Sequence, residues 1–134
     1  MKALLLSIKP QYVDKILRGV KTFEYRKRLA KEDVSVIYVY CTAPIKKVVA
    51  VVQVVGKLSD SPVRLWEKTK TMSGISRDKY DEYFSGCKIA HAYELGKVDI
   101  FKEGKNLSDF GINVAPQSYA YVDMRETLHY SPHR

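Results

Sequence analysis

The chain has 134 residues and a formal net charge of +8, from 23 lysines and arginines against 15 aspartates and glutamates. This length suits one domain, and a hydrophobic content of 46% is enough for an ordinary globular core. No apolar run is long enough to cross a bilayer, so the sequence predicts no membrane-spanning helix.

The first 18 residues predict a strand followed by a helix. Residues 3–8 are apolar enough for a buried strand. Residues 10–18 predict a short helix, because Pro10 suits the first helical position and apolar side chains recur at helical spacing. Gly19 then fits the left-handed position that ends a helix.

A second strand is predicted directly after this glycine, where the apolar period changes from about 3.6 to 2 residues. Its alternation points Phe23 and Tyr25 to one side and Glu24 and Arg26 to the other. The helix-to-strand junction therefore places Lys21 beside a strand face that carries a carboxylate and a guanidinium.

The rest of the chain alternates between β-rich and helical stretches. Strands are predicted at residues 34–41, 48–55, 88–101 and 116–123, and helices at residues 63–71 and 76–84. Gly56 indicates a bulge or bend after the second of these strands. We expect one α+β domain over residues 1–123, built on a partly closed β-barrel of five or six strands with inserted helices, and a flexible tail over residues 124–134.

The positive charge is concentrated at the amino-terminal end. Residues 1–31 contain nine lysines and arginines but only Asp14 and Glu24 as acids, whereas the remaining residues hold fourteen basic and thirteen acidic side chains. A localised positive field suits a polyanion such as a nucleic acid. A basic surface that only aids solubility is the plainer alternative.

Nothing in the sequence calls for an oxidising compartment, a metal or a cofactor. Cys41 and Cys87 lack metal-site spacing, and Cys41 fits a strand as a small core residue. Three scattered histidines do not make a ligand set, and His91 fits a strand as a structural residue. The apolar stretch at residues 3–6 is too short for a signal peptide, so we expect a cytoplasmic protein.

Lys21, Glu24 and Arg26 are a candidate binding site. A carboxylate between two cations holds both in fixed geometry, and a planar guanidinium can grip a phosphate or a base edge. A partly desolvated lysine has a lowered pKa and can act as a base. Alternating charges on a strand are also typical of a solvated face with weak ion pairs. Spacing alone does not decide between these two interpretations.

Residues 19–26, GVKTFEYR, resemble the GxKxxExR motif of the ASCH domain family, which is related to PUA-like RNA-binding domains. All four fixed positions match. Residues 4–10 (LLLSIKP), 61–66 and 116–119 (PQSY) are also similar to the small stand-alone members of that family, so the resemblance covers about residues 3–122. It implies a PUA-like β-barrel with a cleft beside the first helix, built around Lys21.

Further ligand contacts are expected around this cleft. Lys9, Lys15 and Arg18 are candidates for phosphate contacts, which position a nucleic acid without reading its sequence. Polar contacts and base stacking from the opposite wall are expected from Gln117, Ser118 and Tyr119. The alternative is a plain last strand with its tyrosine in the core.

The first functional hypothesis is a module that binds RNA or a nucleotide-like ligand in a cleft lined by Lys21, Glu24 and Arg26. The second is a hydrolase with Lys21 as the catalytic residue, since some ASCH relatives are ribonucleases and others remove an acyl group from a modified cytidine. In the amidohydrolase branch a nucleophilic threonine occupies the position of Glu24, and this sequence departs from it there. The third is a regulatory domain whose basic face binds an acidic protein. The sequence does not determine the oligomeric state.

Overall fold

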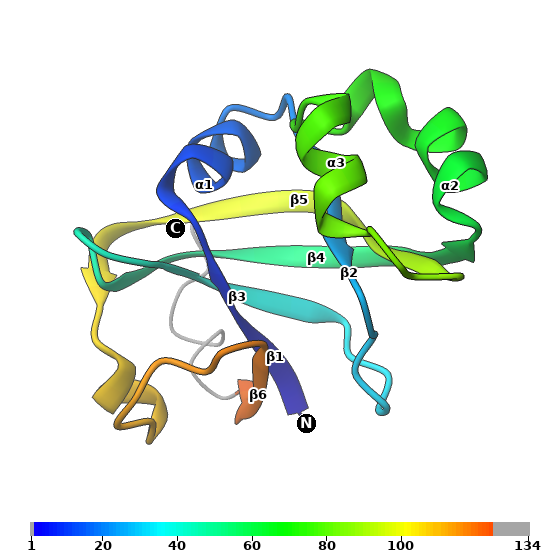
Figure 1. Cartoon of the computed structure of the whole chain (residues 1–134). Helices are drawn as coiled ribbons and strands as arrows, with labels where there is room; N and C mark the ends of the chain where they lie inside the picture. Colours follow the sequence, from blue (N-terminus) through cyan, green and yellow to red (C-terminus); the bar gives the residue numbers. More distant parts are fainter. Residues whose placement is uncertain (1, 125–134) are drawn as a thin grey trace.

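Six strands form one mixed sheet in the computed structural model, which describes residues 2–124 (Figure 1). Their bounds are Lys2–Ile8 (β1), Phe23–Arg26 (β2), Val36–Cys41 (β3), Lys47–Asp60 (β4), Ala90–Lys105 (β5) and Tyr119–Asp123 (β6). The strands lie in the order β2-β5-β4-β3-β1-β6. β1 and β3 pair in parallel, and the other pairings are antiparallel.

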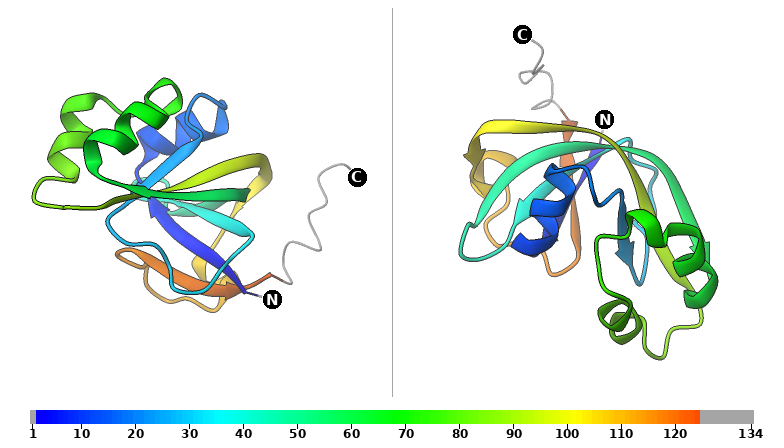
Figure 2. Two further views of the ribbon diagram at one scale, coloured as in Figure 1. Left: turned by 90° about the vertical axis from the view of Figure 1, so that its right-hand side faces the viewer. Right: turned by 90° about the horizontal axis from the view of Figure 1, so that it is seen from above.

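The three α-helices lie on the same side of the long strands β4 and β5 (Figures 1 and 2). They are Pro10–Leu17 (α1), Pro62–Thr69 (α2) and Arg77–Tyr83 (α3). Two short 3-10 helices, Lys70–Met72 (η1) and Leu107–Phe110 (η2), follow α2 and β5. The domain is therefore of the α+β class that the sequence predicts. Within residues 2–124, no helix has the length and apolar character that a membrane crossing needs.

The helices begin where local capping predicts. Pro10 occupies the first position of α1, and the hydroxyls of Ser61 and Ser76 accept backbone hydrogen bonds at the starts of α2 and α3. Gly19 and Gly86 follow α1 and α3 with φ of 79° and 82°, the left-handed conformation that ends a helix. All three predicted helices are confirmed, the last turn of the second in 3-10 geometry.

β4 and β5 extend beyond their predicted ends, as far as Asp60 and Lys105. The two strands pair with each other along most of their length, with a register shift beside Gly56. The predicted bulge is thus confirmed, but it does not end β4. The reason is that β5 continues to satisfy the backbone hydrogen-bonding groups beyond the bulge.

The sheet is open, and the expected partly closed barrel is not confirmed. β2 and β6 stand at the two ends of the strand order. Among the described residues, no strand pairing joins β2 to β1 or β6, but side-chain hydrogen bonds do. The guanidinium of Arg26 donates to the carbonyl oxygens of Ser7 at 3.1 Å and Ser118 at 3.5 Å. The backbone N–H of Glu32 donates to the hydroxyl of Tyr121 at 3.0 Å. Hydrogen bonds from β2 and from the loop after it therefore hold the two ends of the sheet together.

Three clusters of buried side chains fill the domain. The first lies between the sheet and α1 and includes Ile16 and Cys41, which is buried as predicted. The second is covered by η2. The third lies under α2 and α3 and includes Tyr25 and Trp66. Met124, the first residue of the predicted tail, packs against the second cluster, and residues 125–134 of that tail lie outside the described part of the chain.

A buried hydroxyl pair joins β2 to α2 and yields a stability prediction. The Thr69 hydroxyl donates to the Leu65 carbonyl at 2.7 Å, so the Tyr25 hydroxyl must donate in its own 2.6 Å bond with Thr69. Thr69→Val leaves that phenol without its acceptor, and we expect a loss of about 1–3 kcal/mol of unfolding free energy in urea titrations. The double variant with Tyr25→Phe should recover part of this loss. Additive losses would contradict the pairing.

Candidate functional site

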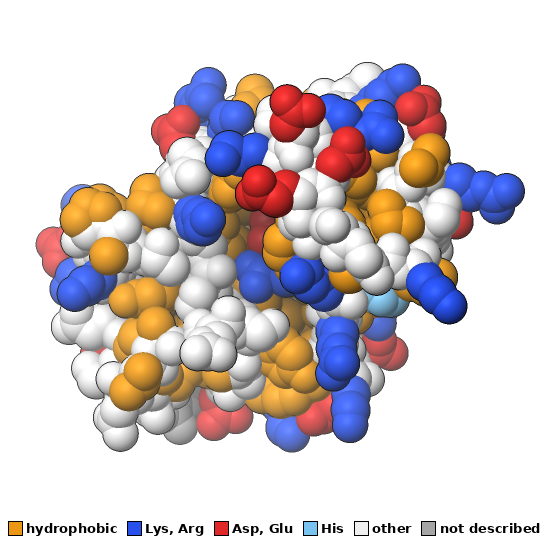
Figure 3. Space-filling model, in the orientation of Figure 1, with side chains coloured by type: hydrophobic (Ala, Val, Ile, Leu, Met, Phe, Trp, Pro, Cys, Tyr) orange, Lys and Arg blue, Asp and Glu red, His pale blue; other side chains and the backbone are white. Residues whose placement is uncertain are grey.

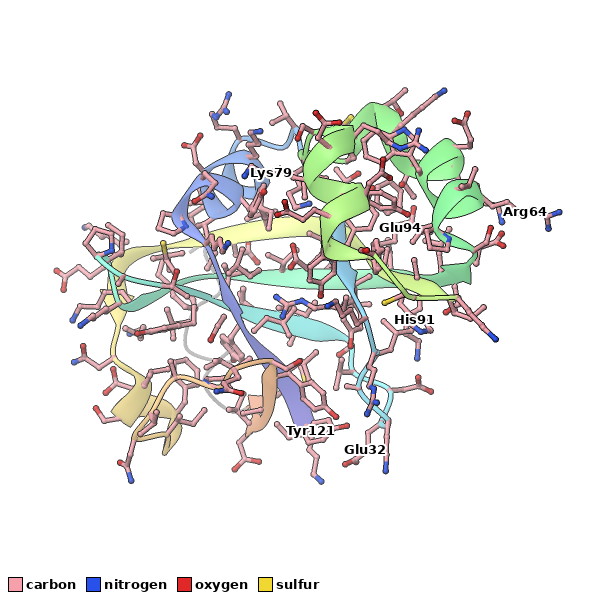
Figure 4. All side chains as sticks on the ribbon, viewed as in Figure 1. Glu32, Arg64, Lys79, His91, Glu94 and Tyr121 are labelled. Atoms are coloured by element: carbon pink, nitrogen blue, oxygen red, sulfur yellow. The ribbon has the colours of Figure 1, made fainter. Side chains whose placement is uncertain are left out.

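A cleft of about 380 Å³ opens between α1, β2 and α3. Its lining comes from three segments that are far apart in the sequence, within residues 7–12, 21–27 and 75–83. The space-filling view shows the surface hollowed between α1 and α3 (Figure 3). Lys79 of α3 lies on this side, facing α1 (Figure 4). A volume in this range suits a small ligand such as a nucleoside.

Lys21 lies in the floor of the cleft and is only 4% exposed. Its ammonium nitrogen donates to the carbonyl oxygen of Ser73 at 2.7 Å. The same nitrogen lies 5.5 Å from the ring centroid of Tyr12 and 4.9 Å from that of Tyr25. Cation–π attraction to two rings and one hydrogen bond therefore hold a lysine side chain that is otherwise removed from water.

Burial lowers the pKa of Lys21 from its ordinary value, because the charged form loses its hydration. The carboxylate of Glu24 opposes this shift, and the neighbouring cations Lys15 and Arg26 add to it. Desolvation is the largest of these effects. Lys21 consequently releases its proton at lower pH than an exposed lysine does, and its amine can act as a base.

Glu24 and Arg26 bind each other in the cleft wall. Their closest nitrogen–oxygen distance is 2.9 Å, and a second hydrogen bond of 3.2 Å joins the same carboxylate oxygen. Both side chains are nearly buried, and the guanidinium also binds the carbonyl oxygens of Ser7 and Ser118. A buried arginine without such partners is strongly destabilising. The pair therefore shapes the cleft as well as lining it.

The loop before α3 positions Lys21 from the opposite side. Gly74 has φ of +66°, and a Cβ atom placed on it would lie 2.5 Å from the Cβ of Lys21. Its carbonyl oxygen accepts a hydrogen bond from the Lys15 ammonium at 3.3 Å. The N–H of Thr22 donates to the carbonyl oxygen of Met72 at 3.0 Å. Only glycine lets this loop pass so close to the lysine.

The rim of the cleft combines cations with an exposed aromatic ring. Tyr83 is 36% exposed, and the Lys27 ammonium lies 5.1 Å from its ring centroid. Lys9 and Lys79 are exposed and form no ion pair with any other described residue. The lining as a whole has five cationic side chains and two acidic ones. The cleft is therefore net positive.

Four of the residues singled out by the sequence line the cleft: Lys9, Lys21, Glu24 and Arg26. Arg18 does not, because its guanidinium pairs with Asp14 at 2.9 Å on the exposed face of α1. Lys15 lies beside the cleft and acts on it through its bond to the Gly74 carbonyl.

The structure places Gln117, Ser118 and Tyr119 outside the lining, where α3 forms the opposite wall. Gln117 is exposed, and Ser118 reaches the site only through its carbonyl oxygen. The ring of Tyr119 packs beside the first core cluster, 5.5 Å from the Tyr121 ring. The side chains of these three residues therefore do not line this cleft.

Tyr12, Lys79 and Tyr83 are lining residues that the sequence reasoning missed. Both tyrosines have the helical spacing that is typical of core-facing residues. This spacing alone does not show that they lie at the edges of their helices, beside the cleft. A hydrogen bond of 2.6 Å joins the Nδ1 ring nitrogen of His91 and the Ser59 hydroxyl. Within residues 2–124, no three His, Cys, Asp or Glu side chains are grouped so that they could hold a metal ion.

The fold is thus that of a small α+β domain, and the geometry of the site is that of a basic cleft beside the first helix. The family model for the ASCH domain matches residues 6–99. The chain belongs to the ASCH domain family.

Several curated relatives share sequence with this chain. An ASCH domain-containing ribonuclease from Zymomonas mobilis is 28% identical over 95 residues, 70% of this chain and 64% of that protein. An ATP synthase subunit alpha from Ureaplasma parvum is 30% identical over 122 residues, and a large ribosomal subunit protein uL22 from the same species is 30% identical over 86 residues. These matches cover 90% and 64% of this chain, which spans only 15% and 28% of the two proteins.

Solved structures share the fold over nearly the whole chain. The crystal structure of ASCH from Zymomonas mobilis has a TM-score of 0.84 at 25% identity and covers 94% of this chain and 91% of that one. A point mutant of the Zymomonas mobilis protein has a TM-score of 0.86 at 24% identity, with 98% of each chain covered. The arrangement of the open sheet and three helices is therefore that of known ASCH structures.

The lowered pKa of Lys21 predicts a pH dependence of stability. Because the unfolded lysine holds its proton up to about pH 10.5 and the folded one releases it earlier, the unfolded state binds more protons between the two values, and stability rises with pH there. We expect the unfolding free energy of the wild type, relative to Lys21→Met, to increase as the pH rises through the alkaline range toward 10.5. Urea titrations across this range measure it. A flat or falling difference would contradict the desolvation of the ammonium.

Gly74→Ala tests the close approach of the loop to Lys21. The matched control is Gly111→Ala, since Gly111 has φ of +75° with nothing within 4 Å of an added Cβ. Both variants carry about 1–2 kcal/mol of left-handed strain, and Gly74→Ala should lose about 1–3 kcal/mol more through overpacking. Equal losses in chemical unfolding would show that the loop can move away from the lysine without cost.

Proposed function

We propose that this chain binds RNA or a nucleotide-like ligand in the cleft between α1 and α3. The observation that carries the proposal is the combination of a desolvated lysine floor, unpaired cations at the rim and tyrosine rings in one cleft of nucleoside size. We further propose that residues 1–123 act as a single cytoplasmic domain. Its open sheet is interpreted as a PUA-like barrel that is split between the end strands β2 and β6.

The charges of the cleft support an anionic ligand. Glu24 is occupied by Arg26, so it does not cancel the rim lysines. Lys9, Lys27 and Lys79 carry their charges at the exposed rim, where phosphate groups are usually bound. In this arrangement the rim lysines position the phosphate while the floor contacts the base or sugar.

The floor and walls support a nucleoside rather than a bare phosphate. Lys21 uses one of its three N–H donors for the Ser73 carbonyl, which leaves two for a base edge or a ribose oxygen. Tyr83 offers an exposed ring, and Tyr12 a half-buried one, for stacking. Single-stranded RNA is recognised mainly through such stacking and edge contacts.

RNA hydrolysis is the second candidate function. It is favoured by the relative from Zymomonas mobilis that is described as a ribonuclease and by the lowered pKa of Lys21. A neutral amine can accept the proton of an attacking ribose hydroxyl, and its charged form can stabilise the developing charge on phosphate. The amidohydrolase alternative gains no support, because Glu24 is paired with Arg26 and neither Thr22 nor Ser118 lines the cleft.

The first test is a titration of fluorescently labelled single-stranded RNA with wild type, Lys21→Met and Arg18→Gln at several salt concentrations. Each variant removes one positive charge from the same region, but only Lys21 lines the cleft. We expect Lys21→Met to weaken binding by about 10- to 100-fold, the value of a hydrogen bond to a charged donor, and Arg18→Gln by less than about threefold.

The RNA is recovered and sized on a denaturing gel after each titration. Intact RNA supports a binding module, and RNA that is shortened by the wild type but not by Lys21→Met supports the ribonuclease. Equal weakening by the two variants, or no binding at low salt, would mean that the cleft is not the RNA site.

A further inference from the structure

A basic segment leads out of the cleft along the loop between β2 and β3. Lys27, Arg28 and Lys31 are all exposed, and Lys27 belongs to both the segment and the cleft lining. Figure 3 shows basic side chains continuing from the central hollow toward the lower right, over the end of β2 and the following loop. The labelled Glu32 marks this loop in Figure 4. The positive surface of the cleft therefore does not end at its rim.

The acids of this loop do not neutralise its cations. Glu32 pairs with Lys2 at 3.1 Å, and Asp33 pairs with Lys57. Within residues 2–124, neither Arg28 nor Lys31 forms an ion pair. Their charges remain available to an anion from solution.

Three tyrosine hydroxyls hold the loop in place. The N–H of Lys27 donates to Tyr83 at 3.2 Å, that of Ala30 to Tyr93 at 2.8 Å, and that of Glu32 to Tyr121 at 3.0 Å. These tyrosines come from α3, β5 and β6, so the loop is tied to three different elements. A loop that is already ordered loses little conformational entropy when it binds a ligand.

The opposite rim, formed by α3, has three acids beside two cations, Arg77 and the lining residue Lys79. Asp78, Asp81 and Glu82 of α3 are exposed, and Figure 3 shows acidic side chains over this helix above the hollow. Asp81 pairs with Arg77 at 3.0 Å, whereas Glu82 lines the cleft. Beyond the cleft, α3 presents more acids than cations and the loop after β2 presents cations, so a bound strand is drawn along the loop.

We infer that residues 27–31 form a phosphate-binding track for single-stranded RNA, which continues from the cleft and makes an oligonucleotide a better ligand than a short fragment. The inference rests on the proposed function. It adds that the ligand is a polymer and that its strand leaves the cleft along residues 27–31. Arg28 and Lys31 are its principal contacts, because both lie beyond the cleft lining.

The experiment compares labelled uridine oligonucleotides of three and twelve nucleotides by fluorescence anisotropy across a salt series. The track variant is Arg28→Gln with Lys31→Gln. The matched control is Arg64→Gln with Lys102→Gln, two exposed cations on α2 and β5 that do not line the cleft. Figure 4 shows Arg64 pointing away from the body of the molecule.

Two phosphate contacts contribute about 1.4 to the slope of log K against log salt for a single strand. The track variant should lose this part of the slope. At 0.1 M salt it should bind the twelve-mer roughly 25-fold more weakly, because a slope of about 1.4 over the decade between 1 M and 0.1 M salt corresponds to that factor. It should bind the three-mer as the wild type does. The control should bind both oligonucleotides like the wild type.

Two results would overturn the track while leaving the cleft intact. One is a wild type that binds both lengths equally, and the other is equal weakening by the track and control variants. Loss of three-mer binding in the track variant would also overturn the inference, because the loop would then act inside the cleft. Failure of the wild type to bind either oligonucleotide would overturn the proposed function itself. Sizing the RNA afterwards separates cleavage from weak binding.

Discussion

The pairing of Arg26 with Glu24 is the interaction on which the site depends. A guanidinium is always charged, so it can be buried only where partners surround it. Arg26 finds one carboxylate and two backbone carbonyl oxygens, which belong to β1 and to the residue before β6. It thereby joins parts of the open sheet that no strand pairing joins. Two of the four motif residues, Glu24 and Arg26, thus hold β2 against β1 and the residue before β6, beside the cleft.

The lowered pKa of Lys21 results from its burial between β2, α1 and the loop before α3. The side chain is buried against Tyr12, Tyr25 and the Gly74 loop, and desolvation outweighs the attraction of Glu24. Its pKa is therefore lowered even though a carboxylate lies nearby. A lysine in this state can donate to a ligand when charged and accept a proton when neutral, which suits either binding or hydrolysis.

The surface charge around the cleft is directional. The α1 and β2 side of the lining carries Lys9 and Lys27, whereas α3 carries Lys79 together with Glu82, and the basic loop after β2 extends only the first side. Membership of the ASCH domain family and a relative described as a ribonuclease agree with an RNA-related ligand. The basic loop after β2 is the basis of the inferred orientation of a bound strand, which neither comparison contains.

The sequence by itself determined the features that depend on near neighbours. Proline and serine caps set the helix starts, Gly19 ended α1, and the change of period placed Lys21 at a helix-to-strand junction. Only the tertiary structure decided that α3 rather than residues 117–119 faces Lys21, that Gly74 packs on its stem, and that the sheet stays open. These are contacts between residues some fifty or more positions apart, and local periodicity carries no information about which distant segments the chain brings together.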